Sequence, residues 1–162
     1  MYENAALCTT CGGKCCKRMP GEMIPEDVCR MYPSATLHGS VNAALASGKI
    51  VVDWWEGDPR DISYDAEDYM DRCGYLRPRA YTDDPLSVKC GSWGGSCNFL
   101  GVEGCELSPE MRPLSCSLLE PQEDGSCLMH DGGGKKAAAL AWLPYQDLVW
   151  GAVRTWFAER RK

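Results

Sequence analysis

The chain has 162 residues, of which 44% are hydrophobic and 25% charged, and its formal net charge is −6. This is the composition of a globular domain, so it excludes a disordered, collagen-like or coiled-coil protein. The acidic balance argues against a nucleic-acid partner, because nucleic-acid-binding proteins present basic surfaces. The unusual feature is 11 cysteines beside two histidines and two phenylalanines, which points to metal binding.

Two sequence features bear on the cellular compartment. The longest wholly apolar run is seven residues, 137–143, whereas a membrane span needs about 20. The first residues include Glu3, no basic residue before Lys14 and no apolar run of signal-peptide length. We therefore expect a cytoplasmic protein with no membrane partner. In a reducing compartment cysteines bind metal more often than they form disulfides, and an odd count excludes complete pairing within the chain.

Two short helices are predicted first along the chain. Pro25 suits the first position of a helix, and acidic residues follow it, so a helix is predicted over residues 25–32. Ser40 can cap a second helix over residues 41–47, and Gly48 is a fitting stop.

A strand is predicted next, over the β-branched and aromatic residues 49–55. Trp54 and Trp55 would point to opposite faces of that strand. We expect one to pack in the core and the other to cover a metal-binding loop, with a ligand-stacking rim as the alternative. Residues 65–73 predict another short helix, ended by Gly74.

The remainder divides into a loop-rich zone, residues 81–134, and a helical zone, residues 135–162. In the helical zone apolar residues recur at helical spacing: Leu148, Val149, Ala152, Val153, Trp156 and Phe157. The sequence thus predicts a small, loop-rich α+β fold of mostly short helices with one or two short strands. We expect residues 1–162 to form a single metal-stabilised, cysteine-rich domain with the segment 135–162 packed on it.

The first cysteine group, the head group, reads Cys8-x2-Cys11-x3-Cys15-Cys16. Two thiolates separated by two residues can bind one ion, because a tight turn brings their sulfurs together. Glycines 12–13 permit the left-handed backbone that such a turn needs. Thiolates suit both zinc and iron–sulfur clusters, so this pattern leaves the cofactor open between the two.

The second group is Cys97-x7-Cys105-x10-Cys116-x10-Cys127. Its spacings suit ligands that come from successive loops. Together with the head group it supplies eight candidate ligands, enough for two closed tetrahedral sites or for one polynuclear site. His130 lies three residues after Cys127 and is a possible nitrogen ligand.

Four other residues bear on this candidate site. Cys29 and Cys73 are interpreted as small buried apolar residues. Cys90 is interpreted in the same way, although it lies in the second cysteine zone. Arg112 is a candidate second-shell residue that holds a carbonyl or carboxylate near the site and offsets the charge of several thiolates.

The head group resembles the CxxCxxxCC signature of the YkgJ-type cysteine-cluster family, which is described as zinc- or iron-chelating. Residues 95–100 (GSCNFL) and 104–107 (GCEL) resemble its second element, and residues 112–116 (RPLSC) resemble its third. The resemblance implies metal binding at seven cysteines: Cys8, Cys11, Cys15, Cys16, Cys97, Cys105 and Cys116. Cys127 is added from spacing alone. The family commonly has arginine after the last motif cysteine, where this chain has Ser117.

These observations predict a cytoplasmic zinc- or iron(–sulfur)-binding protein. In the first hypothesis the cysteine-ligated centre is mainly structural and the domain binds a protein partner. The second is a metal- or iron–sulfur-dependent enzyme or redox protein whose substrate the sequence does not indicate. The third is a metal carrier that exchanges ions at Cys15 and Cys16.

Overall fold

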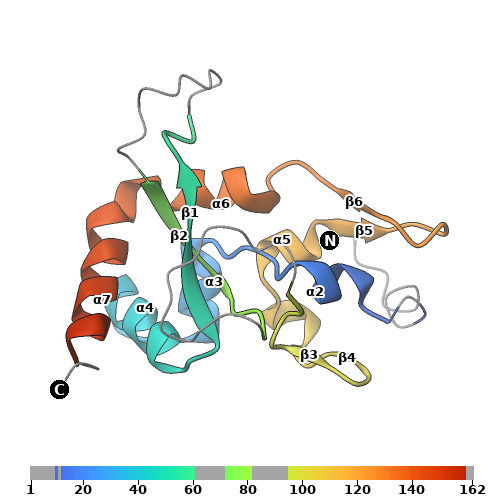
Figure 1. The fold of residues 1–162 in the computed structure, drawn as a ribbon, viewed down its shortest axis with the longest axis horizontal. Coiled ribbons are helices and arrows are strands. Elements are labelled where there is room, and N and C mark those ends of the chain that lie inside the picture. Colours follow the sequence, from blue (N-terminus) through green and yellow to red (C-terminus); the bar gives the residue numbers. More distant parts are fainter. Residues whose placement is uncertain (1–9, 11, 61–71, 82–94, 160–162) are drawn as a thin grey trace.

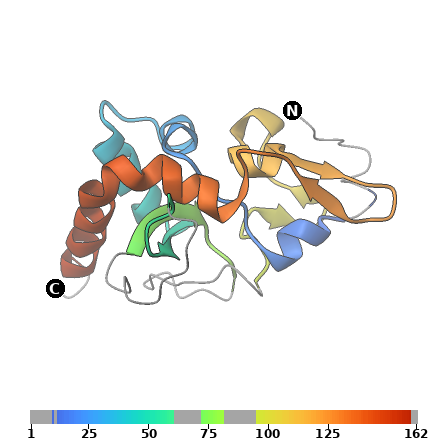
Figure 2. The same ribbon diagram turned by 90° about the horizontal axis from the view of Figure 1, so that it is seen from above.

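The computed structural model describes residues 10, 12–60, 72–81 and 95–159. Its fold is α+β, and its elements form two lobes (Figures 1 and 2). The core lobe consists of α3 (Pro25–Met31), α4 (Leu37–Ala46), β1 (Ile50–Glu56), β2 (Arg72–Pro78), α6 (Gly134–Trp142) and α7 (Gln146–Glu159). The cysteine lobe consists of α2 (Lys14–Arg18), β3 (Leu100–Gly101), β4 (Gly104–Cys105), α5 (Leu114–Ser117), β5 (Leu119–Pro121) and β6 (Cys127–Met129). The 3₁₀ turns are Pro109–Met111 and Leu143–Tyr145.

The chain visits each lobe twice. From α2 it enters the core lobe, returns to the cysteine lobe for β3 to β6, and ends on α6 and α7 (Figure 1). Segments of the two cysteine groups therefore lie in the same lobe although many residues separate them in sequence. The strands form three antiparallel pairs, β1–β2, β3–β4 and β5–β6.

The predicted helix at residues 25–32 is confirmed as α3. Asp27 caps its start by accepting the Ile24 N–H. The second helix, α4, begins earlier than predicted, because Thr36 is its N-cap and accepts the Gly39 N–H at 3.1 Å. Ser40 was the wrong cap, since it lies buried inside α4. The helix ends before Gly48, as predicted.

The predicted strand at residues 49–55 is confirmed as β1, which pairs antiparallel with β2. The helix predicted over residues 65–73 is wrong at its end, because residues 72–73 begin β2; residues 65–71 lie outside the described residues. Gly74 lies within this strand instead of ending a helix. A Cβ atom there would lie 3.1 Å from both Val149 and Trp150 of α7, so glycine allows the close packing of α7 on β2.

The expectation for the tryptophan pair is confirmed for one ring only. Trp55 packs against the hydrophobic core. Trp54 contacts residues of its own hairpin: Arg72 lies 4.6 Å from the ring centroid, and Glu56 accepts the indole N–H. That it covers a metal-binding loop stays a prediction.

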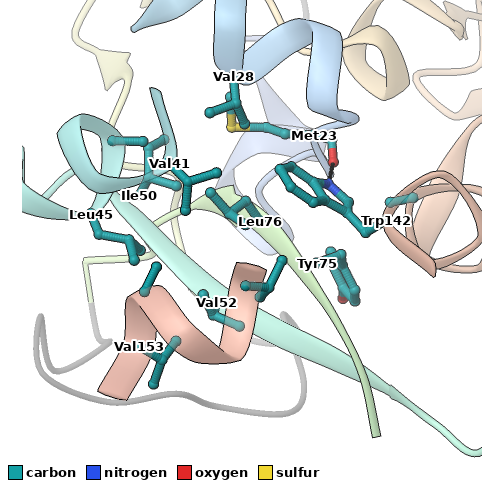
Figure 3. Packing of buried hydrophobic residues seen from close by; sticks show 14 of the residues in the cluster. Met23, Val28, Val41, Leu45, Ile50, Val52, Tyr75, Leu76, Trp142 and Val153 are labelled. Atoms are coloured by element: carbon teal, nitrogen blue, oxygen red, sulfur yellow. Dashed lines mark hydrogen bonds between the residues drawn. The ribbon is translucent and has the colours of Figure 1, made fainter. Parts of the chain in front are cut away.

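The hydrophobic core lies between the β1–β2 hairpin and helices α3, α4, α6 and α7 (Figure 3). Trp142 of α6 is fully buried at its centre, and its indole Nε1 donates to Met23 O at 2.7 Å. Val149, Ala152 and Val153 form the buried face of α7, which confirms the helical spacing predicted near the C-terminus.

Residues 20–27, here called the hub segment, connect the two lobes. On the core side, Met23 accepts the Trp142 indole N–H and its own N–H donates to Leu76 O. On the cysteine side, Glu22 O accepts the Ser115 hydroxyl at 2.7 Å, and Asp27 accepts the Leu114 N–H at 2.9 Å. These last two bonds fix the start of α5, and with it Cys116, relative to the core.

The packing of α7 on β2 predicts opposite effects for two glycine substitutions. Gly74→Ala places a methyl group against Val149 and Trp150, and such overpacking should lower the free energy of unfolding by about 1–3 kcal/mol. Gly151→Ala, inside α7 where an added Cβ meets only the tip of Arg154 at 3.9 Å, should raise it by roughly 0.5–1 kcal/mol through helix propensity. Urea unfolding of both variants measures these changes, and equal effects would contradict the packing described.

Candidate metal centre

The head group reaches the cysteine lobe through α2, which carries Cys15 and Cys16. Gly12 and Gly13 precede the helix with φ of 62° and 69°, which confirms the predicted left-handed turn. A Cβ atom at Gly13 would lie 2.7 Å from Leu100 Cδ1, so this turn also packs closely on β3. Cys8 and Cys11 lie outside the described residues.

The second group comes from four successive pieces of the chain, as its spacing predicted. Cys97 forms an isolated bridge with Ala80, just beyond the end of β2. Cys105 ends β4, Cys116 lies in α5, and Cys127 begins β6 opposite Pro121. Each cysteine is thus placed by a short element rather than by a long helix or strand.

The two groups meet around Cys15. Its sulfur lies 3.9 Å from the Cys16 sulfur and is hydrogen-bonded to the Cys127 side chain. The thiols of Cys97, Cys105 and Cys116 lie within electrostatic range of Cys15. The backbone joins the groups as well, because the Cys97 N–H donates to Cys16 O at 2.7 Å. All the described cysteines are free thiols.

The thiols differ in their readiness to ionise. The hydrogen bond with Cys16 lowers the pKa of Cys15 to about 6, against the opposing effect of burial. The same bond, aided by burial, raises the pKa of Cys16. Burial raises the pKa of Cys97 to about 11, and it also raises those of Cys105 and Cys116. The pKa of Cys15 thus lies below that of an ordinary thiol, whereas the pKa values of Cys16, Cys97, Cys105 and Cys116 lie above it.

The cysteine sulfurs of the two groups are the kind of donor that a sulfur-preferring metal ion or cluster requires. Zinc and iron–sulfur clusters bind thiolates, and each thiol that binds must release its proton. Within the described ranges, however, no three His, Cys, Asp or Glu side chains stand in an arrangement that could hold one ion. Cys8 and Cys11, both predicted ligands, fall outside those ranges.

The backbone around Cys116 is tightly constrained. A Cβ atom at Gly21 would overlap the Cys116 sulfur, so only glycine fits at this place in the hub segment. Next to it, Glu22 is buried and its Oε2 has no hydrogen-bond partner among the described residues. Burial raises the pKa of this carboxyl group.

Arg112 holds a carbonyl of the loop that follows Cys105. Its Nε donates to Leu107 O at 3.1 Å, and the Leu107 N–H is hydrogen-bonded to the Cys105 sulfur. Its own carbonyl accepts a bond from Arg30 of α3 at 2.8 Å. Arg112 thus fixes the loop that follows Cys105; that it supports a metal site stays a prediction.

The other predicted candidates take different positions. His130 Nε2 lies 2.7 Å from the Glu120 carboxylate, so that ring nitrogen is already engaged. Cys73 is buried and its thiol donates to Ala139 O, as expected of a packing residue. Cys29 is exposed on α3, which contradicts its interpretation as a buried residue. Cys90 lies outside the described residues.

A buried ion pair was not predicted. Asp53 of β1 and Arg77 of β2 are fully buried, and Arg77 Nε donates to Asp53 at 2.8 Å. Arg77 also lies within electrostatic range of Cys97, whose thiolate it favours. No sequence signal pairs these residues, because only the register of β1 with β2 brings them together.

The pKa values of Cys15 and Cys97 predict that these two thiols react in different pH ranges in the metal-free protein. Alkylation of Cys15 by iodoacetamide should increase with pH and reach half its maximal rate near pH 6, because the thiolate is the nucleophile. Cys97 should reach half its maximum only near pH 11. Peptide mass spectrometry of samples quenched across this pH range measures both rates. Equal profiles for the two cysteines would contradict the electrostatics described.

Comparison with known proteins supplies no relative: no protein-family model, curated protein or solved structure matches this chain. No helix in the described part of the chain is both long and apolar enough to span a bilayer.

Proposed function

We propose that this protein binds zinc or an iron–sulfur cluster through its motif cysteines, and that the centre is mainly structural. The observation that best supports this proposal is the convergence of six cysteines from two distant groups on one lobe: Cys15, Cys16, Cys97, Cys105, Cys116 and Cys127. Cys8 and Cys11 complete the proposed ligand set, in which every cysteine but Cys127 is implied by the resemblance to the YkgJ-type family.

The make-up of the cysteine lobe supports a structural role. Its strands are only two or three residues long, and two-stranded hairpins are at best marginally stable alone. The hydrophobic core is drawn mainly from the other lobe, with Cys97 and Phe99 as buried contributions from the cysteine zone. A metal bound by several of these loops would stabilise them, since metal binding and folding are coupled.

A protein-interaction module in the cytoplasm is the role that we propose for this centre. Support comes from three large apolar side chains that the cysteine lobe exposes, Val102, Leu114 and Leu128. Exposed apolar side chains of this kind suit a protein partner, whereas the net charge of −6 does not suit a nucleic acid.

The second candidate is a metal- or iron–sulfur-dependent enzyme or redox protein. The adjacent thiols of Cys15 and Cys16, 3.9 Å apart and only half-buried, favour this reading, because a small reactant can reach them. A redox titration, rather than metal removal, separates the two candidates. Removal of either kind of centre should lower the melting temperature, because any group bound by the folded protein stabilises it. Only a redox centre should also change its visible spectrum reversibly when dithionite and then ferricyanide are added.

The test is to purify the protein without oxygen, measure zinc and iron, and record the visible spectrum. We expect either a colourless zinc protein or a brown iron protein that absorbs near about 400 nm. Cys16→Ser should lose metal, and a loss of ~2 kcal/mol would lower the melting temperature by about 4–8 °C in a domain of this size. Cys29→Ser, at an exposed position on α3, is the matched control and should keep both metal and melting temperature.

Two results would overturn the proposal. One is a wild-type protein that carries neither zinc nor iron after anaerobic purification. The other is a Cys16→Ser variant whose metal content and melting temperature equal those of the wild type.

A further inference from the structure

We infer that the two cysteine groups share ligands in one centre, with Cys15 as the cysteine that joins them. The alternative is one closed site for each group, the head cysteines holding one ion and the second group another. This inference rests on the proposed function and concerns only how the ligands are divided.

The position of Cys15 between the two groups supports a shared centre. Its sulfur contacts Cys16 of its own group at 3.9 Å and Cys127 of the second group through a hydrogen bond. In a segregated arrangement the closest thiol partners of Cys15 would all belong to the head group. Instead, one of its two hydrogen-bonded thiol partners comes from the far end of the second group.

Hydrogen bonds from the backbone and side chain of residues 96–97 to α2 also support a shared centre. The Cys97 N–H donates to Cys16 O at 2.7 Å, and the Ser96 hydroxyl donates to Lys17 O at 3.3 Å. These bonds attach α2 to the segment that carries Cys97, and Leu100 of β3 lies close to the Gly13 turn. In the described residues the two groups are therefore in direct contact through their backbones.

The remaining thiols extend the same neighbourhood. Cys116 lies in electrostatic range of Cys97, Cys105 and Cys15, and Cys16 lies in range of Cys97 and Cys116. Every described cysteine of the second group thus interacts with the head group, directly or through one neighbour. Each thiol that binds metal releases one proton to solvent, and no oxidant or reductant is required.

Metal-protection mapping tests the inference. Apo-protein is loaded with Zn²⁺ alone, or anaerobically with ferrous iron and sulfide, and treated with N-ethylmaleimide; protected cysteines are identified by peptide mass spectrometry. In Cys15→Ser we expect metal content to fall at least about tenfold, since even outer-shell changes cost about 10–100-fold in affinity. Cys127 should then be alkylated as fast as in metal-free wild type. Reciprocally, Cys127→Ser should expose Cys15 and Cys16.

The experiment distinguishes failure of the ligand sharing from failure of the proposed metal-binding function. If wild type is loaded but Cys15→Ser keeps half or more of its metal and its second-group cysteines stay protected, the sharing is wrong and the metal-binding function stands. If wild type protects no cysteine under either loading condition, the proposed function itself fails. Cys29→Ser is the control, and its protection pattern should match that of wild type.

A measurement on the unmodified chain covers the case in which Cys15→Ser does not fold. Phenylarsine oxide bridges pairs of neighbouring thiols, so in the apo-protein it should link Cys15 to Cys127 as well as to Cys16. Adducts confined within each cysteine group would overturn the inference.

Discussion

The hub segment, residues 20–27, is the constraint on which both lobes depend. Its backbone at Met23 binds β2 and the indole of Trp142, so it belongs to the hydrophobic core. Within a few residues its Glu22 carbonyl and its Asp27 carboxylate hold the start of α5. Because Gly21 abuts the Cys116 sulfur, a displacement of this segment would move a candidate ligand directly. The hub segment thus positions Cys116 relative to the core, to which another candidate ligand, Cys97, itself belongs.

The cysteine lobe, unlike the core lobe, is not held together mainly by apolar packing. Its thiols are half-buried or buried, and all but Cys15 among those with a shifted pKa hold their protons more firmly than a free cysteine does. A cluster of protonated thiols between very short strands contributes little packing. Binding a cation there would replace these protons and cross-link loops from both ends of the chain, which is where large loop-closure effects arise. This is the physical basis for a structural centre.

Local signals in the sequence account for a defined part of the fold. Pro25 with its acidic neighbours predicted α3, the β-branched run predicted β1, and the apolar spacing predicted the buried face of α7. Long-range packing decided the rest. Gly74 is read locally as a helix stop, but its contact with Val149 and Trp150 places it inside β2.

The candidate site divides in the same way. Cysteine spacing indicated which residues could be ligands, because spacing is a local property. It could not indicate that Cys127 meets Cys15, that Asp53 pairs with Arg77, or that Cys29 is exposed, since these depend on strand register and on how the lobes join. For Arg112 the sequence indicated only that an arginine side chain could hold a carbonyl group, and the fold determines that this carbonyl is that of Leu107.

The central claim is that a metal shared by both cysteine groups orders the cysteine lobe. Hydrogen exchange followed by mass spectrometry, on the anaerobically loaded protein and on the same protein after chelation, tests this most directly. We expect that chelation strongly accelerates exchange in peptides from residues 95–133, while peptides from β2, α6 and α7 keep their protection. Unchanged exchange in residues 95–133, or equal acceleration throughout the chain, would contradict it.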